Sequence, residues 1–116
     1  MSLEALVQQI RDAGAQAAAV VSRDGSVLAA DLPPGVSRET FSIMCATIHG
    51  ASMTVSSQIR REAPRRIVLD SASGSVVIME AGRRALVVVV LPDGFDLEAV
   101  SAWLPPIVER VARETS

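Results

Sequence analysis

The sequence predicts one α+β domain in which helices cover both faces of a mostly antiparallel five-stranded sheet. Three observations support this fold class. The chain has 116 residues, the size of one ordinary domain with a single core. A glycine-containing turn at residues 23–25 separates two apolar runs, which is typical of a hairpin. The longest apolar run, residues 85–91, is rich in β-branched side chains on both faces, so we expect a central strand with helices above and below it.

The first part of the chain is predicted to form a helix and then a hairpin. Apolar residues at helical spacing follow Ser2, a candidate N-cap, and Gly14 is placed to end this helix. Two strands, at residues 17–21 and 27–30, flank the turn. Residues 33–35, with two prolines and a glycine, then break the second strand.

The longest predicted helix covers residues 38–62 and is closed by Pro64. One row of its side chains is the predicted core face: Phe41, Met44, Cys45, Ile48, Ser52, Val55 and Ile59. A second row, here called the small-residue row, contains Ser42, Ala46, Gly50, Met53 and Ser57. A glycine in mid-helix costs about 1 kcal/mol relative to alanine. That cost is easier to explain if another backbone approaches closely at Gly50.

Three strands and a final helix are predicted in the remainder. We expect strands at residues 67–69, 76–79 and 85–91, with a turn at residues 71–74 between the first two. Apolar spacing then predicts a last helix, which Pro105-Pro106 would kink or split. Tight turns inside both strand groups make the predicted sheet mostly antiparallel.

The composition excludes several classes of function. Hydrophobic residues make up 49% of the chain, which excludes a disordered polypeptide. A formal charge of −2 and 3% aromatic residues argue against nucleic-acid binding. All 11 basic residues are arginine, so the chain has no Schiff-base or P-loop lysine. One unpaired cysteine, no recognisable signal peptide and no apolar run of about 20 residues lead us to expect a cytoplasmic domain without membrane insertion.

The sequence gives no sign of catalytic chemistry. The single histidine, His49, has no triad motif around it. Cys45 and His49 are four residues apart and, doubled across a two-fold axis, could supply four zinc-type ligands. A free core thiol and a lone histidine are the commoner alternative. We therefore predict no catalytic residue, no cofactor and no metal.

Several segments together resemble the Roadblock family, which includes roadblock-type dynein light chains, bacterial polarity regulators and Ragulator scaffold subunits. Residues 17–29 (AAAVVSRDGSVLA) look like the first hairpin of that family, and the small-residue second helix follows. The strands at residues 74–78 and 85–91 come in the family's order. The likeness covers nearly the whole chain, with departures at Pro105-Pro106 and in a short connection at residues 33–36. It implies a three-layer sandwich with the long second helix on one face of the sheet and the terminal helices on the other.

The resemblance also implies a dimer. Two copies usually join through the second helix and the neighbouring edge strand, which extends the sheet across a two-fold axis. We expect the small-residue row to form the seam between the helices; the alternative is tight packing on the chain's own sheet. The edge strand is expected to contribute Arg65, Ile67 and Leu69. The alternative there is that charged side chains protect a solvent-exposed edge.

Family members scaffold or regulate Ras-like small GTPases, and some act as GTPase activators. The resemblance therefore implies a homodimer, or a heterodimer with a paralogue, that docks on a Ras-like GTPase and modulates its nucleotide cycle. The residues assigned to partner binding are His49, Arg60, Arg61 and Arg66; the alternative is that Arg60 and Arg61 offset the helix dipole while the other arginines are solvated. Two other functions remain open: a scaffold subunit without effect on GTP turnover, and a small ligand-sensing domain.

Overall fold

The computed structural model describes all residues from Met1 to Ser116, which form three helices and five strands. In chain order these are α1 (Leu3–Asp12), β1 (Ala17–Ser22), β2 (Val27–Asp31), α2 (Arg38–Gln58), β3 (Arg66–Ser71), β4 (Gly74–Ala81), β5 (Ala85–Pro92) and α3 (Leu97–Glu114). This is the order of elements that the sequence predicts.

The five strands form one antiparallel sheet in the order β2-β1-β5-β4-β3. The two-faced apolar strand β5 lies in the centre, as predicted, and its residues from Ala85 to Val89 are completely buried. The edge strands β2 and β3 each pair with one neighbour. Each therefore leaves one row of backbone N–H and C=O groups without a partner in the sheet.

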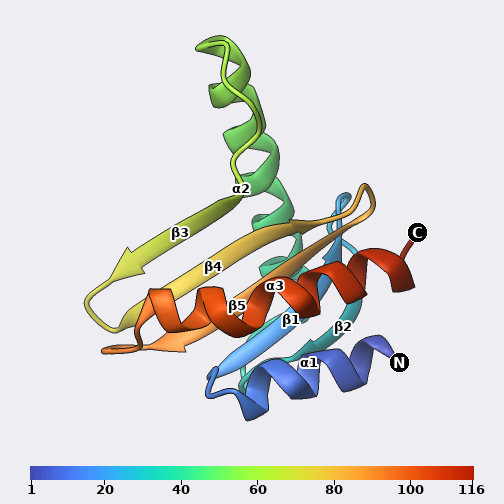
Figure 1. Ribbon diagram of the computed structural model, residues 1–116, viewed down its shortest axis with the longest axis vertical. Coiled ribbons are helices and arrows are strands. Elements are labelled where there is room, and N and C mark those ends of the chain that lie inside the picture. Colours follow the sequence, from blue (N-terminus) through green and yellow to red (C-terminus); the bar gives the residue numbers. More distant parts are fainter.

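Helices cover both faces of the sheet, which confirms the three-layer arrangement (Figure 1). The larger apolar cluster joins α1 and α3 to one face, with Leu6, Ile10 and Leu104 among its buried members. The smaller cluster lies under α2 on the other face and contains Cys45, Ile78 and Val88. The apolar core under α2 is therefore the smaller of the two.

Helix α2 ends four residues earlier than the sequence predicts. Its start is as expected: the Ser37 hydroxyl accepts a hydrogen bond from the Thr40 N–H at 3.2 Å, which caps the first turn. At the other end, Arg60 adopts a left-handed conformation with a φ of 57°. The N–H groups of Arg60 and Arg61 then bond to the carbonyls of Ser57 and Ser56, which closes the helix without a glycine.

Helix α3 is not split at its two prolines and runs as one helix from Leu97 to Glu114. Proline has no N–H to donate to the preceding turn. Pro105 and Pro106 both lie on the exposed side of α3, where water can reach the carbonyls that lose their donors. None of the three helices combines the length and apolar character that a bilayer-crossing segment needs.

Candidate dimer and partner interface

Helix α2 is longer than the sheet that supports it. Its buried residues are Ser42, Cys45 and His49, all in the first 12 of its 21 positions. Figure 1 shows α2 crossing the strands and continuing past the edge of the sheet where β3 begins. Residues 50–59, here called the projecting half of α2, contain no buried side chain.

The projecting half exposes large apolar side chains. Val55 and Ile59 are each 63% exposed, and Met53 is 39% exposed. In proteins, most of the stability of a helix comes from packing of its apolar face. The projecting half therefore has both the length and the apolar surface to pack on a second protein.

The predicted core face of α2 is partly wrong. Cys45 is buried, and Phe41, Ile48 and Ser52 are half-buried, as expected for residues that face the sheet. Met44, Val55 and Ile59 are exposed instead. Met44 lies on the flank of the helix, and the other two lie where no strand of this chain runs beneath α2.

The small-residue row is divided between core and surface. Ser42 is completely buried against the chain's own sheet, so the structure removes it from the predicted seam, and Ala46 is half-buried beside it. Gly50, Met53 and Ser57 are exposed. A Cβ added to Gly50 would meet no atom within 4 Å. Nothing within this chain therefore requires a glycine at this position.

Strand β3 provides an open edge beside the projecting half. It pairs with β4 from Arg66↔Met79 to Ser71↔Gly74, and its other side is unpaired. Ile67 packs against the apolar cluster under α2, and Leu69, two residues further along on the same face, is 40% exposed. Arg65 lies just before the strand and is exposed.

The arginines near Pro64 do not form one patch. Arg60 and Arg61 follow the end of α2 and are exposed. Arg66 is separated from them by strand geometry: its side chain reaches Ser101 of α3, on the opposite face of the sheet from α2. Adjacency in sequence placed Arg66 in the same predicted group, but alternation along β3 puts it on the other side.

His49 is an internal residue, which corrects its assignment to partner binding. Its side chain is 5% exposed, and its Nε2 lies 3.4 Å from Oε2 of Glu80 on β4. The same carboxylate is 2.6 Å from the guanidinium of Arg23, beside the β1–β2 turn. This polar cluster attaches the middle of α2 to the sheet and leaves the imidazole no access to a docked protein.

Cys45 is a protonated core thiol. It lies on the sheet side of α2, and burial raises its pKa to about 11. A thiol with such a pKa is a poor nucleophile and metal ligand near neutral pH. The structure contains no group of three or more His, Cys, Asp or Glu side chains placed to hold a metal ion.

Comparisons with known proteins agree with this architecture. The family model of the Roadblock/LC7 domain matches residues 1–91. The uncharacterized protein MJ0714 of Methanocaldococcus jannaschii is 30% identical over 83 residues, which are 72% of this chain and 70% of that protein.

Two solved structures have closely similar folds. MglB of Myxococcus xanthus is 15% identical with a TM-score of 0.90, over 97% of this chain and 93% of that one. A structure described as MglB with tetrameric arrangement is 23% identical with a TM-score of 0.84, over 94% of this chain and 84% of that one. At these identities the two structures show a shared fold, and their coverage includes the last helix, which lies outside the family match.

Proposed function

Because this chain belongs to the Roadblock/LC7 domain family, we propose that it is a non-catalytic regulator of a Ras-like small GTPase that works as a homodimer. One observation carries the proposal: α2 extends past its own sheet and exposes Val55 and Ile59 next to the open edge of β3. The choice of a small GTPase as the partner rests on the resemblance of the sequence to the family.

The dimer would form about a two-fold axis beside β3. Two copies of an open edge strand can pair with each other, and such an interface uses the same surface of both protomers. Since α2 already passes beyond that edge, each projecting half would then lie over the partner's sheet. There it would cover the face that exposes Leu69 and bury its own Val55 and Ile59.

The paired α2 helices would form the docking platform for the GTPase. Their N-terminal halves expose Ile43 and Met44, each about half accessible. Arg60 and Arg61 at the ends of the helices add positive charge. A platform that binds one conformation of the GTPase switch segments more tightly shifts the population toward it, and this changes nucleotide turnover without a catalytic group from the platform.

The burial of His49 and Cys45 supports a protein that acts by binding its partner and not by catalysis. The only histidine and the only cysteine both lie on the buried side of α2, where neither would face a docked protein. The chemistry of GTP hydrolysis would accordingly belong to the GTPase.

Sedimentation equilibrium tests the dimer. We expect the wild-type protein to be dimeric at micromolar concentration and Val55→Asp to be monomeric, because the substitution places a charge in the buried contact. Thr47→Asp is the matched control, since Thr47 is exposed on the half of α2 that the sheet supports. A wild-type monomer, or equal dissociation of both variants, would contradict the proposed interface.

GTP hydrolysis by the cognate GTPase, with and without this protein, tests regulation. We expect the hydrolysis rate to change with the wild-type protein and to return to its basal value with Val55→Asp. Binding without any change in rate would identify a scaffold instead of a regulator. If Arg60→Ala/Arg61→Ala bound and acted like the wild type, these two arginines would not belong to the docking site.

A further inference from the structure

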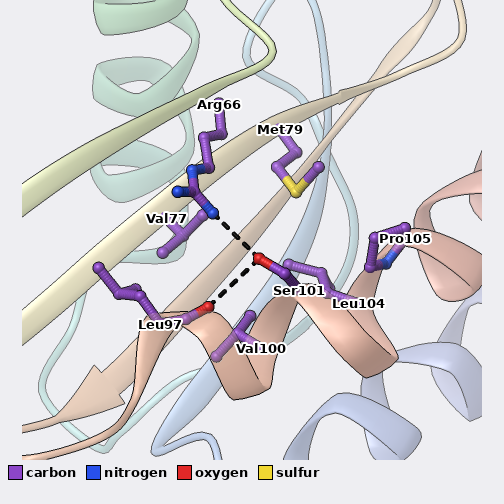
Figure 2. A pocket seen from close by; sticks show the side chains of 8 residues that line it. All are labelled: Arg66, Val77, Met79, Leu97, Val100, Ser101, Leu104 and Pro105. Atoms are coloured by element: carbon purple, nitrogen blue, oxygen red, sulfur yellow. Dashed lines mark hydrogen bonds between the residues drawn. The ribbon is translucent and has the colours of Figure 1, made fainter.

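A second candidate site lies on the face of the sheet opposite α2. A cavity of about 30 Å³ opens between β3, β4 and the first half of α3 (Figure 2). Its walls are apolar and come from both layers: Val77 and Met79 from β4, with Leu97, Val100 and Leu104 from α3. Arg66, Ser101 and Pro105 complete the lining.

The guanidinium of Arg66 lies at this cavity without an anionic partner. It donates one hydrogen bond, from Nη1 to Oγ of Ser101 at 3.2 Å, and the Ser101 hydroxyl donates to the Leu97 carbonyl at 3.3 Å (Figure 2). No carboxylate lies within ion-pair distance of Arg66, and its remaining donors are free. A guanidinium can bind a carboxylate through two parallel hydrogen bonds, because two of its donors match the two oxygens.

The size of the cavity indicates the kind of occupant. About 30 Å³ holds roughly two water-sized groups. Pockets for cofactors and metabolites are about ten times larger or more. The branched end of one aliphatic side chain fits such a cavity, whereas a nucleotide or an acyl chain does not.

The backbone of α3 adds a feature that suits a peptide. Pro105 cannot donate a hydrogen bond to the carbonyl of Ser101, four residues earlier. The Ser101 carbonyl therefore lacks its usual helical donor, and Ser101 is one of the residues that line the cavity. A peptide segment brings N–H donors, which an isolated carboxylic acid does not.

We propose that this cavity is a docking site for an acidic segment of another protein. One leucine, isoleucine or methionine side chain of the segment enters the cavity between β4 and α3. A neighbouring aspartate or glutamate pairs with Arg66. The site lies on the opposite face from α2, so it is available whether or not the α2 surface is occupied. The protein would then hold two partners at once, one on each face.

Selection from a phage-displayed library of random 12-residue peptides tests the site. The full chain is the bait, and soluble Arg66→Glu protein is the competitor that removes peptides bound elsewhere. We expect the selected peptides to share an aliphatic residue next to an acidic one. Failure to enrich any peptide, or a consensus without that pair, would overturn the proposal.

Binding of a synthetic selected peptide, measured by fluorescence anisotropy, provides the quantitative test. Arg66→Glu should weaken binding at least about tenfold, because it replaces an ion pair with a repulsion. Arg84→Glu should bind like the wild type, since Arg84 is an equally exposed arginine without an ion pair in the β4–β5 turn. Equal binding by all three proteins would place the peptide elsewhere.

Two further measurements separate recognition from structural damage. A peptide with lysine in place of its acidic residue should bind Arg66→Glu more tightly than it binds the wild type, which a merely misfolded variant would not do. 4-Methylpentanoate carries the same aliphatic end and carboxylate without a peptide backbone, and we expect it to compete only weakly. Competition as strong as that of the peptide would overturn the assignment to a protein segment.

Discussion

The Nε2 atom of His49 on α2 lies 3.4 Å from Oε2 of Glu80 on β4. His49 is the last buried residue of the helix, and after it only Ser52 and Ser56 are half-buried. Glu80 also forms an ion pair with Arg23, so one carboxylate lies between α2, β4 and the β1–β2 turn.

Glu80→Ala should therefore destabilise the protein. The substitution removes the ion pair between Glu80 and the partly buried guanidinium of Arg23, and a hydrogen bond to a charged group contributes about 1.5–3 kcal/mol. Urea denaturation measures this loss in the free energy of unfolding. Glu109→Ala is the control, because Glu109 is exposed and makes no ion pair. Identical midpoints for the two variants would show that the cluster does not hold α2.

The stability of the folded chain should decrease between about pH 9 and pH 11. Burial raises the pKa of Cys45 from 9.0 to about 11, so the folded state keeps its thiol proton where the unfolded state has lost it. The state that binds more protons is disfavoured as the pH rises, so the free energy of unfolding falls across this window and levels off above it. The chain has no lysine and no tyrosine, so no other side chain titrates there.

Urea denaturation at several alkaline pH values checks this behaviour, with Cys45→Ala as the control. The variant should show no comparable slope between pH 9 and 11, whatever its absolute stability. A slope of equal size in both proteins would assign the effect to another group.

Gly50→Ala should stabilise the protomer and weaken the dimer. An added Cβ meets no atom of this chain, so the protomer gains about 0.8–1.0 kcal/mol from the higher helix propensity of alanine. If a second α2 approaches at this glycine, the methyl group crowds that contact and costs about 1–3 kcal/mol of association free energy. Denaturation in the Val55→Asp background measures the first effect, and sedimentation of Gly50→Ala alone measures the second. A dimer that is strengthened would place the helix contact elsewhere.

Gly74→Ala should be strongly destabilising. Gly74 begins β4 with a φ of 140°, and a Cβ there would overlap the carbonyl oxygen of Leu91 on the adjacent strand. Backbone strain and overlap together should cost at least about 2 kcal/mol. Thermal unfolding compares this variant with Gly50→Ala, the same substitution at an open helical position. A melting temperature equal to that of the wild type would contradict the close approach of β4 and β5.

The element order and the central position of β5 could be predicted because their signals are local. The turn at Gly25 and the two-faced apolar run of β5 each specify their own structure without knowledge of distant residues. The ends of α2 and α3 were harder to predict. Arg60 closes α2 in a left-handed conformation that normally belongs to glycine, and solvent exposure allows α3 to continue through Pro105-Pro106.

The faces of α2 could not be predicted from periodicity. Val55 and Ile59 recur at the same spacing as core residues, yet each is 63% exposed, because periodicity marks an apolar face without showing what covers it. Conversely, Ser42 and His49 are polar but buried. Their burial depends on where the sheet lies beneath the helix, which the local sequence does not encode.

The cavity beside Arg66 was missed, although one signal for it was present. Alternation along β3 assigns Arg66 and Ile67 to opposite faces, so Arg66 could have been separated from Arg60 and Arg61. Its contact with Ser101 joins residues 35 positions apart, and only the folded chain brings them together.

The exposed C-terminal half of α2 also has a consequence for the steady-state level of this protein in a cell. In the proposed dimer, a protomer that has not yet found its partner exposes the apolar side chains of α2 and the unpaired edge of β3. Exposed apolar surface and open strand edges are features that chaperones and proteases recognise in incompletely assembled chains. Newly made polypeptide should be degraded quickly while it is scarce and persist once it is abundant enough to find a second copy. Its steady-state level should then rise more steeply than its rate of synthesis.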